Sequence, residues 1–111
     1  MKKTTDTLGE FEQVVLLALL RLGSNAYGAT VRREIEHRTG RSLSISAVYT
    51  ALDRMEQKGL VASRIGEPTA ERGGRRKRYF KLEPAGERAL ANSYRNFKEM
   101  VTGFEKKLER L

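Results

Sequence analysis

Cations and aromatic rings are concentrated in one short stretch of the sequence. Between Arg72 and Lys81 there are six Lys or Arg side chains in ten residues and no acid, and the pair Tyr79–Phe80 lies among them. Lys and Arg bind phosphate through charge and hydrogen bonds, so this stretch suits an anionic partner such as nucleic acid. This stretch could be a localisation signal, a disordered basic tail, a phosphate-binding loop or the tip of a hairpin that binds nucleic acid. The surrounding sequence has to decide between these four interpretations.

The sequence offers little for metal, redox or nucleophilic chemistry. It contains no Cys and one His, His37, so neither a thiolate site nor a histidine cluster can form, and zinc-dependent DNA modules are excluded. Glycines stand at positions 66, 73 and 74, but the Gly-Lys-Ser/Thr ending of a Walker phosphate loop is missing. We therefore expect no metal, no cofactor and no enzymatic activity.

The chain as a whole is short and basic. Its 111 residues are enough for one small core, and 22 Lys and Arg against 14 Asp and Glu give a net charge of +8. Such a surplus favours nucleic acid or an acidic membrane surface as partner. The longest apolar run, residues 14 to 20, is far shorter than the ~20 residues of a membrane span. We expect a cytoplasmic protein with no membrane partner.

Two helices are predicted in the first forty residues. Residues 9 to 22 are helical in composition but apolar nearly all the way round, which indicates a helix buried on two sides, against its own core and against a second subunit. Gly23 and Asn25 end this helix. A second helix is predicted from Tyr27 to Arg38. Its expected core residues are Ala29, Val31 and Ile35.

The third predicted helix has defined ends. Ser44 is the expected N-cap, with Leu43 and Val48 placed as a hydrophobic staple, and Gly59 follows the last turn. The apolar residues recur at steps of 3, 4 and 3, so one stripe faces the core and the opposite side is small and polar. The core stripe consists of Ile45, Val48, Leu52 and Met55.

Alternating residues after this helix predict a β-hairpin. Residues 60 to 65 and 76 to 82 are the two expected strands, and a Gly- and Pro-rich loop joins them. Phe80 and Leu82 share one face. Because Arg76 and Arg78 lie on the side of Phe80, one of them is expected to run along the core with only its head exposed. The basic stretch is therefore the loop and second strand of a hairpin.

A long helix is predicted from Pro84 to the end of the chain, since Pro is tolerated in a first helical turn. Its apolar residues fall at alternating steps of 4 and 3, the spacing of a heptad seam. We interpret this seam as a dimerisation surface; the alternative is a helix folded back onto its own domain. The seam consists of Leu90, Tyr94, Phe97, Val101, Phe104, Leu108 and Leu111.

Together these elements predict a mainly α fold with a small β-hairpin, a winged helix-turn-helix. Residues 1 to 83 would form the DNA-binding domain and residues 84 to 111 the C-terminal dimerisation helix, in one compact unit. In such folds the third helix enters the major groove of double-stranded DNA and the hairpin contacts the backbone or minor groove. For Tyr49, packing against the second helix is nearly as well supported as a phosphate contact. The predicted DNA contacts are Ser44, Ser46, Ala47, Tyr49, Thr50 and Arg54 on the helix, and Arg75, Arg76 and Lys77 on the hairpin.

The sequence resembles the PadR family of bacterial transcriptional regulators over residues 8 to 111. The resemblance is carried by Leu8–Gly9, Val15–Leu20, Tyr27–Ala29, Ser46–Met55, Lys58–Val61 and Gly74–Gly86. It implies a homodimeric winged-helix protein that binds operator DNA, usually as a repressor, and whose last helix packs against the first helix of the partner. Two residues depart from the family pattern: Phe80 stands where a second Tyr is common, and Glu83 where Thr is common.

The predicted dimer interface combines the first helix with the seam. It comprises Phe11, Val15, Leu90, Tyr94, Phe97, Val101, Phe104 and Leu108. Some members of the family sense small molecules in a cavity between subunits. A small hydrophobic effector is accordingly a candidate partner, in a pocket lined by Phe11, Val15, Phe97 and Phe104. The alternative is that these side chains only pack the dimer.

The predicted function is that of a sequence-specific regulator that binds a palindromic operator as a homodimer. The main alternative is an architectural protein that binds nucleic acid without sequence preference, since phosphate contacts alone would explain the charge. The capped third helix with its small polar face favours sequence-specific DNA binding, because a protein that binds only the phosphate backbone does not need such a helix face. A winged helix that binds protein is a third option, and the acid-free hairpin counts against it.

Overall fold

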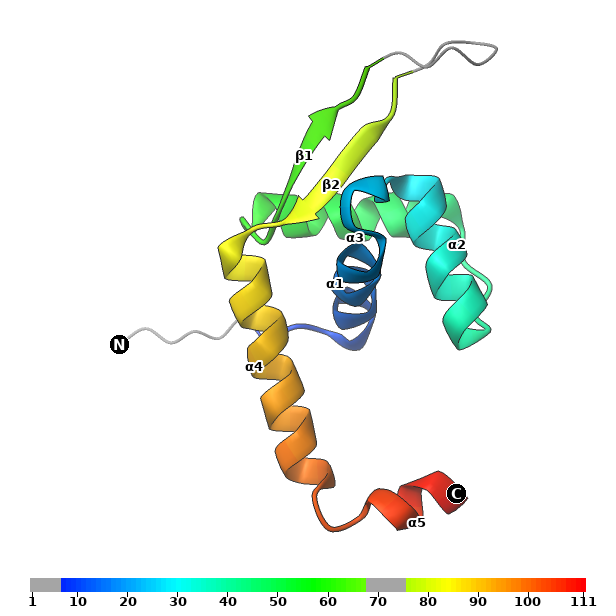
Figure 1. Ribbon diagram of the computed structural model, residues 1–111, viewed down its shortest axis with the longest axis vertical. Helices are drawn as coiled ribbons and strands as arrows, with labels where there is room; N and C mark the ends of the chain where they lie inside the picture. Colours follow the sequence, from blue (N-terminus) through cyan, green and yellow to red (C-terminus); the bar gives the residue numbers. More distant parts are fainter. Residues whose placement is uncertain (1–6, 68–75) are drawn as a thin grey trace.

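The computed structural model describes residues 7–67 and 76–111, and in these residues the chain is mainly helical with one antiparallel hairpin (Figure 1). The order of elements confirms the predicted fold class of a winged helix-turn-helix followed by a C-terminal helix. The elements are α1 (Glu10–Leu22), the 3-10 turn η1 (Gly23–Asn25), α2 (Gly28–Thr39), α3 (Ile45–Gln57), β1 (Val61–Ile65), β2 (Arg78–Leu82), α4 (Pro84–Val101) and α5 (Glu105–Arg110).

Helix α3 has the ends that its sequence predicts. The Ser44 hydroxyl accepts a hydrogen bond from the Ala47 N–H at 3.1 Å, which satisfies one of the free donors of the first turn. At the other end Gly59 has φ +79°, a left-handed conformation that suits Gly. These two caps fix the length of the helix and therefore which side chains it presents.

The core lies where α1, α2 and α3 meet the inner side of the hairpin. Its fully buried members include Leu16, Val31, Ile35, Val48, Leu52, Met55 and Val61. One expectation for α2 is wrong: Ala29 is exposed and Thr30 is buried. The Thr30 hydroxyl donates to the Asn25 carbonyl at 2.7 Å and accepts from the Tyr27 N–H at 2.9 Å. These bonds hold Thr30 inside the turn.

A backbone hydrogen bond ties the hairpin to the segment that leads into α2. Strands β1 and β2 pair from Val61 with Leu82 to Ile65 with Arg78. The Phe80 N–H donates to the Ala26 carbonyl at 2.9 Å, and the Phe80 ring is buried. The hairpin is therefore held at its base by the segment between η1 and α2, with its far end extending from the body of the protein (Figure 1).

The C-terminal region is bent, so the prediction of one unbroken helix to the chain end is wrong. Helix α4 ends at Val101, and Gly103 has φ +97°, which only Gly adopts without strain. The Thr102 hydroxyl donates to the Lys98 carbonyl at 2.8 Å, and the Phe104 N–H donates to the Val101 carbonyl at 2.8 Å. After this turn α5 runs in a different direction (Figure 1), so the heptad spacing does not make a continuous seam.

Candidate nucleic-acid interface

The exposed side of α3 carries small polar side chains. Ser46 and Thr50 are exposed and lie one turn apart, with Asp53 one turn further along the same stripe. Ala47 and Arg54 are exposed beside them. We call Ser46, Ala47, Thr50 and Arg54 the α3 face. It lies opposite the buried stripe of the helix, so the residues that fill the core also decide which residues face outward.

Three of the predicted helix contacts, Ser44, Ser46 and Tyr49, have partners within the protein. The Ser44 hydroxyl caps the helix and lies 3.3 Å from the Ser46 hydroxyl. Tyr49 is half-buried, with its ring centroid 6.5 Å from that of Phe80. A Cβ atom built on Gly28 would stand 2.4 Å from Tyr49 Cζ, so the ring lies against the start of α2. This geometry favours the packing alternative for Tyr49.

Cations and aromatic rings alternate near the described end of the hairpin, on the side of Tyr27. Lys77 Nζ lies 5.1 Å from the centroid of the Tyr27 ring, which meets the Tyr79 ring edge-on at 5.4 Å. Arg64 Cζ lies 4.8 Å from the Tyr79 centroid. Cation–π contacts of this kind orient cationic heads without neutralising them. Arg64 is absent from the predicted contacts, although its place opposite Tyr79 in the hairpin follows from the strand register.

The remaining predicted hairpin contacts are Arg75 and Arg76. Arg76 is exposed just before β2, and Arg75 lies outside the described residues. The structure thus places Arg76, Lys77 and Arg64 on the hairpin as cations near its described end.

Arg78 is the hairpin cation that runs along the core. Its guanidinium carbon lies 4.7 Å from the Phe80 ring centroid, as expected for one arginine of this strand. Arg78 Nη1 donates to Asp53 Oδ1 at 3.0 Å and Nη2 to Glu56 Oε1 at 2.6 Å. The hydrogen bond from the Ser63 hydroxyl and the adjacent guanidinium lower the pKa of the Glu56 carboxyl. Burial alone would lower the pKa of Arg78, but its bonds to the two carboxylates raise it.

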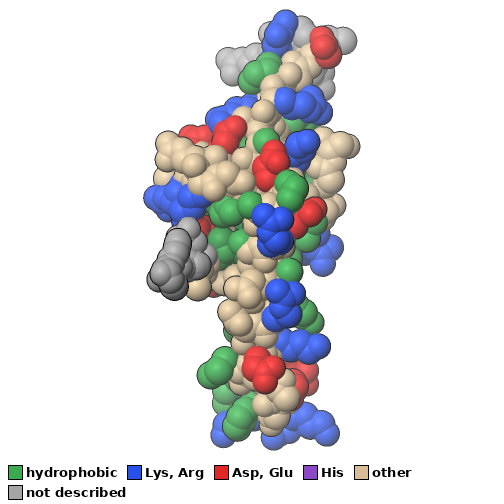
Figure 2. Space-filling view, turned by 90° about the vertical axis from the view of Figure 1, so that its left-hand side faces the viewer, with side chains coloured by type: hydrophobic (Ala, Val, Ile, Leu, Met, Phe, Trp, Pro, Cys, Tyr) green, Lys and Arg blue, Asp and Glu red, His purple; other side chains and the backbone are tan. Residues whose placement is uncertain are grey.

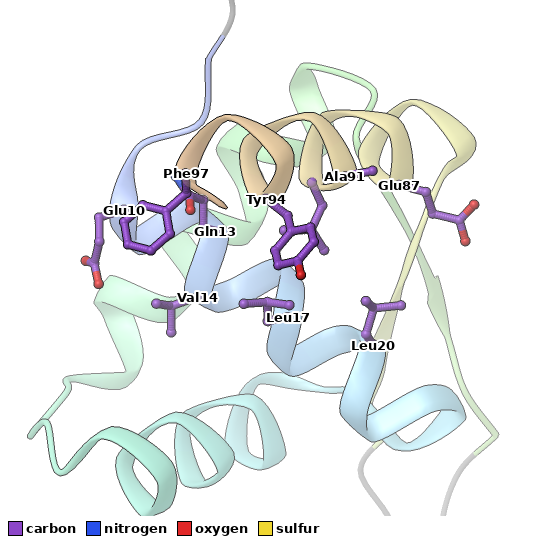
Figure 3. Close-up of a pocket in the computed structure, with 10 residues that line it drawn as sticks. Glu10, Gln13, Val14, Leu17, Leu20, Glu87, Ala91, Tyr94 and Phe97 are labelled. Carbon is purple, nitrogen blue, oxygen red and sulfur yellow. The ribbon is translucent and has the colours of Figure 1, made fainter. Parts of the chain in front are cut away.

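An apolar groove lies between α1 and α4 (Figure 3). It has a volume of about 650 Å³. Tyr94 and Phe97 of α4 point toward Val14, Leu17 and Leu20 of α1. Tyr94 is 62% exposed and Phe97 69% exposed, values that are unusual for such large apolar residues. Figure 2 shows hydrophobic side chains among basic ones on the face of the molecule that forms the left-hand side of Figure 1.

Burial in the core contradicts the prediction that Val15 lies at a dimer interface on α1. Val15 is 0% exposed in the core of its own protomer, so it cannot line a pocket or meet a partner. Phe11 packs against the core with the Arg41 guanidinium 5.8 Å from its ring centroid, outside the groove lining. Phe104 and Leu108 lie beyond the Gly103 turn, exposed. A helix that is apolar all round does not show which of its faces is inside, and Val14 and Leu17 take the outward positions.

The described residues hold little else that suggests chemistry. Within 7–67 and 76–111, no three His, Cys, Asp or Glu side chains gather closely enough to hold a metal ion. His37 is exposed on α2. No helix in this part of the chain is long and apolar enough to cross a membrane.

Comparison with known proteins gives a consistent family and fold. The sequence model of the Transcriptional regulator PadR-like family matches residues 16–92. Among solved structures, a PadR family transcription regulator from Clostridium difficile has a TM-score of 0.69 at 21% identity, covering 88% of this chain and 98% of that one. A comparison with curated protein sequences found no match.

Two further structures share the fold at similar distances. A PadR-like transcriptional regulator from Bacillus cereus has a TM-score of 0.70 at 17% identity, covering 88% of this chain and 90% of that one. A PadR family regulator from Eggerthella lenta has a TM-score of 0.65 at 24% identity, covering 90% and 87%. At these identities the structural likeness concerns the fold, and the match to the family sequence model carries the assignment.

Proposed function

The chain belongs to the PadR-like family of transcriptional regulators, and from this premise we propose that it is a homodimeric repressor that binds a palindromic operator. The third helix of each subunit would enter successive major grooves about 34 Å apart. The hairpins would hold the phosphate backbone or the minor groove beside them. This proposal treats residues 7–67 and 76–83 as the DNA-binding part and α4 with α5 as the dimerisation part.

The observation that carries the proposal is the α3 face. Ser46 and Thr50 are exposed on a helix whose opposite side buries Val48, Leu52 and Met55, while Ile45, expected in that core stripe, is exposed at the first turn. Hydroxyl groups and methyl groups of this size can approach base edges in the major groove, where hydrogen bonds and thymine methyl contacts distinguish bases. Arg54 on the same helix and Arg76 on the hairpin are exposed cations that can meet phosphates on either side.

A second copy of the chain is the proposed occupant of the α1–α4 groove. Beyond Leu90, α4 leaves Tyr94, Phe97 and Met100 exposed, so the protomer alone does not cover the apolar side of this helix. In a twofold-symmetric interface the same patch serves on both sides, and here one groove would receive the exposed rings of the other copy. That arrangement covers α1 on its second side, as its all-round apolar sequence requires.

Selection of bound sequences from a random DNA pool at physiological salt tests the proposal. A palindromic consensus supports a specific dimeric regulator. Enrichment of no sequence, with strong salt-dependent binding, would instead establish the architectural alternative. The two readings differ in this experiment because only the first uses the α3 face.

A small hydrophobic effector is the proposed releasing signal. The groove residues Val14, Leu17, Tyr94 and Phe97 offer apolar and aromatic contact area of the kind that small-molecule sites use. An effector bound in this groove would contact α1 and α4, the helices that are proposed to form the dimer interface. Calorimetry with a panel of phenolics and cationic drugs tests this part, and uniformly silent titrations with DNA-binding-competent protein would reject it.

A further inference from the structure

Helix α3 carries acid on the stripe that is proposed to face DNA. Asp53 follows Ser46 and Thr50 at helical spacing, and its side chain is 52% exposed. Glu56 lies on the adjoining side of the same helix. Uncompensated carboxylates in this position would repel phosphates and oppose the binding that the cations favour.

The Arg78 guanidinium meets these carboxylates with all three of its nitrogen atoms engaged. Nη1 donates to Asp53 at 3.0 Å and Nη2 to Glu56 at 2.6 Å. Nε donates to the Ser63 hydroxyl at 3.1 Å, and that hydroxyl donates to the second oxygen of Glu56 at 2.9 Å. The planar donor geometry of Arg fits such a set of acceptors, and a Lys ammonium would not.

The position of Arg78 joins two parts of the proposed interface. It stands at the first position of β2, while both carboxylates belong to α3. The Arg78 side chain is 35% exposed and lies against the ring of Phe80, which is buried in the core. The guanidinium therefore links the hairpin to the outer side of α3, at the end of the stripe formed by Ser46 and Thr50.

We propose that Arg78 is a positioning residue for DNA recognition, an internal counter-ion that masks Asp53 and Glu56 and clamps the hairpin against α3. Its charge is used within the protein, so it is not one of the phosphate contacts, although it lies in the most basic stretch of the sequence. This inference rests on the proposed DNA-binding function. Within residues 7–67 and 76–111 no carboxylate pairs with Arg76, Lys77 or Arg64, and these cations are proposed to use their charge for DNA.

The test measures affinity and salt dependence for the operator found by selection. Arg78→Met should weaken binding roughly tenfold to a hundredfold, the range for losing charge-assisted bonds, and leave the slope of log affinity against log salt unchanged. Adding Asp53→Asn and Glu56→Gln should recover most of that loss, because no acid is then left unmasked. Lys81→Met removes an exposed cation from the same strand and is the matched control. Adding Asp53→Asn and Glu56→Gln to Lys81→Met should not raise the DNA affinity above that of Lys81→Met alone.

The outcomes separate this inference from the proposed function. A slope that falls by about one in Arg78→Met would show a direct phosphate contact and overturn the inference. So would a triple variant no better than Arg78→Met while the unaltered protein binds well. If Arg78→Met does not fold, the triple variant is compared with the unaltered protein, and an unchanged slope with affinity within a few-fold is expected. Failure of the unaltered protein to bind any DNA would reject the proposed function itself.

Discussion

Gly28 at the start of α2 and the Tyr49 ring on α3 are in direct contact, with no room for a side chain between them. A Cβ atom on Gly28 would lie 2.4 Å from both Cζ and the hydroxyl oxygen of Tyr49. Because the ring also packs beside Phe80, it cannot move away freely. This contact sets the spacing of the two helices of the helix-turn-helix.

Gly28→Ala should therefore destabilise the protein by about 1–3 kcal/mol, the usual cost of overpacking. Chemical denaturation measures the loss. Combining Gly28→Ala with Tyr49→Ala should cost less than the sum of the single changes, since the second removes the ring that the new methyl group would strike. Additive costs would show that the clash is relieved elsewhere.

A second close approach holds the start of α4 to the segment between α3 and β1. A Cβ atom on Gly86 would lie 2.1 Å from the Leu60 carbonyl oxygen, which already accepts a hydrogen bond from the Glu83 N–H at 2.9 Å. Backbone atoms cannot give way as a side chain can, so Gly86→Ala should cost about 2 kcal/mol or more. Asn92→Ala, at an exposed site of the same helix, should change the unfolding free energy by less than about 0.5 kcal/mol. Equal stability of the two variants would contradict the contact.

The helices and strands could be predicted well because their ends and buried faces depend on residues close together in the sequence. The Ser44 cap, the Gly59 stop and the inward Phe80 follow from neighbouring residues alone. The end of α4 at Val101 could not be predicted from the heptad spacing, because that spacing continues past Gly103 although the helix ends before it. The partners of Arg78 lie 22 and 25 residues away, so only the packing of the hairpin on α3 reveals them.

The stability of the fold should fall in acid through two carboxylates. Burial would raise the pKa of Glu12, but the Gly9 N–H and the Lys58 ammonium lower it, and Ser63 and Arg78 lower the pKa of Glu56. Each group is then less protonated in the folded than in the unfolded chain, so its contribution is complete above the ordinary value of 4.5 and is lost as pH falls through the lowered pKa. Unfolding curves between pH 7 and 3 should show this decline, and Glu56→Gln should make it shallower. Glu109→Gln, in α5, is the control; an identical pH profile for both variants would contradict the assignment.

The hairpin and the α3 face should respond differently to substitution. Arg76→Ala should weaken operator and random DNA alike and reduce the salt slope by about one, as expected for loss of one phosphate contact. Thr50→Ala should instead change which bases are preferred, with the slope preserved. Gel-shift titrations over a range of salt concentrations separate the two effects. Arg110→Ala, in α5, is the charge-matched control, and an effect as large as that of Arg76→Ala would indicate non-specific electrostatics.

The α1–α4 groove predicts how the dimer can be broken. Phe97→Glu would place a charge among Val14, Leu17 and Tyr94, where a second copy is proposed to bury it, and an unpaired buried charge is strongly unfavourable. Sedimentation should then show monomers. The same charge at Asn92, on the opposite side of α4, should leave the dimer intact. Because Phe97 is exposed in the protomer, the monomer should remain folded by circular dichroism yet bind a half-site poorly. A Phe97→Glu protein that still sediments as a dimer would place the interface elsewhere on the molecule.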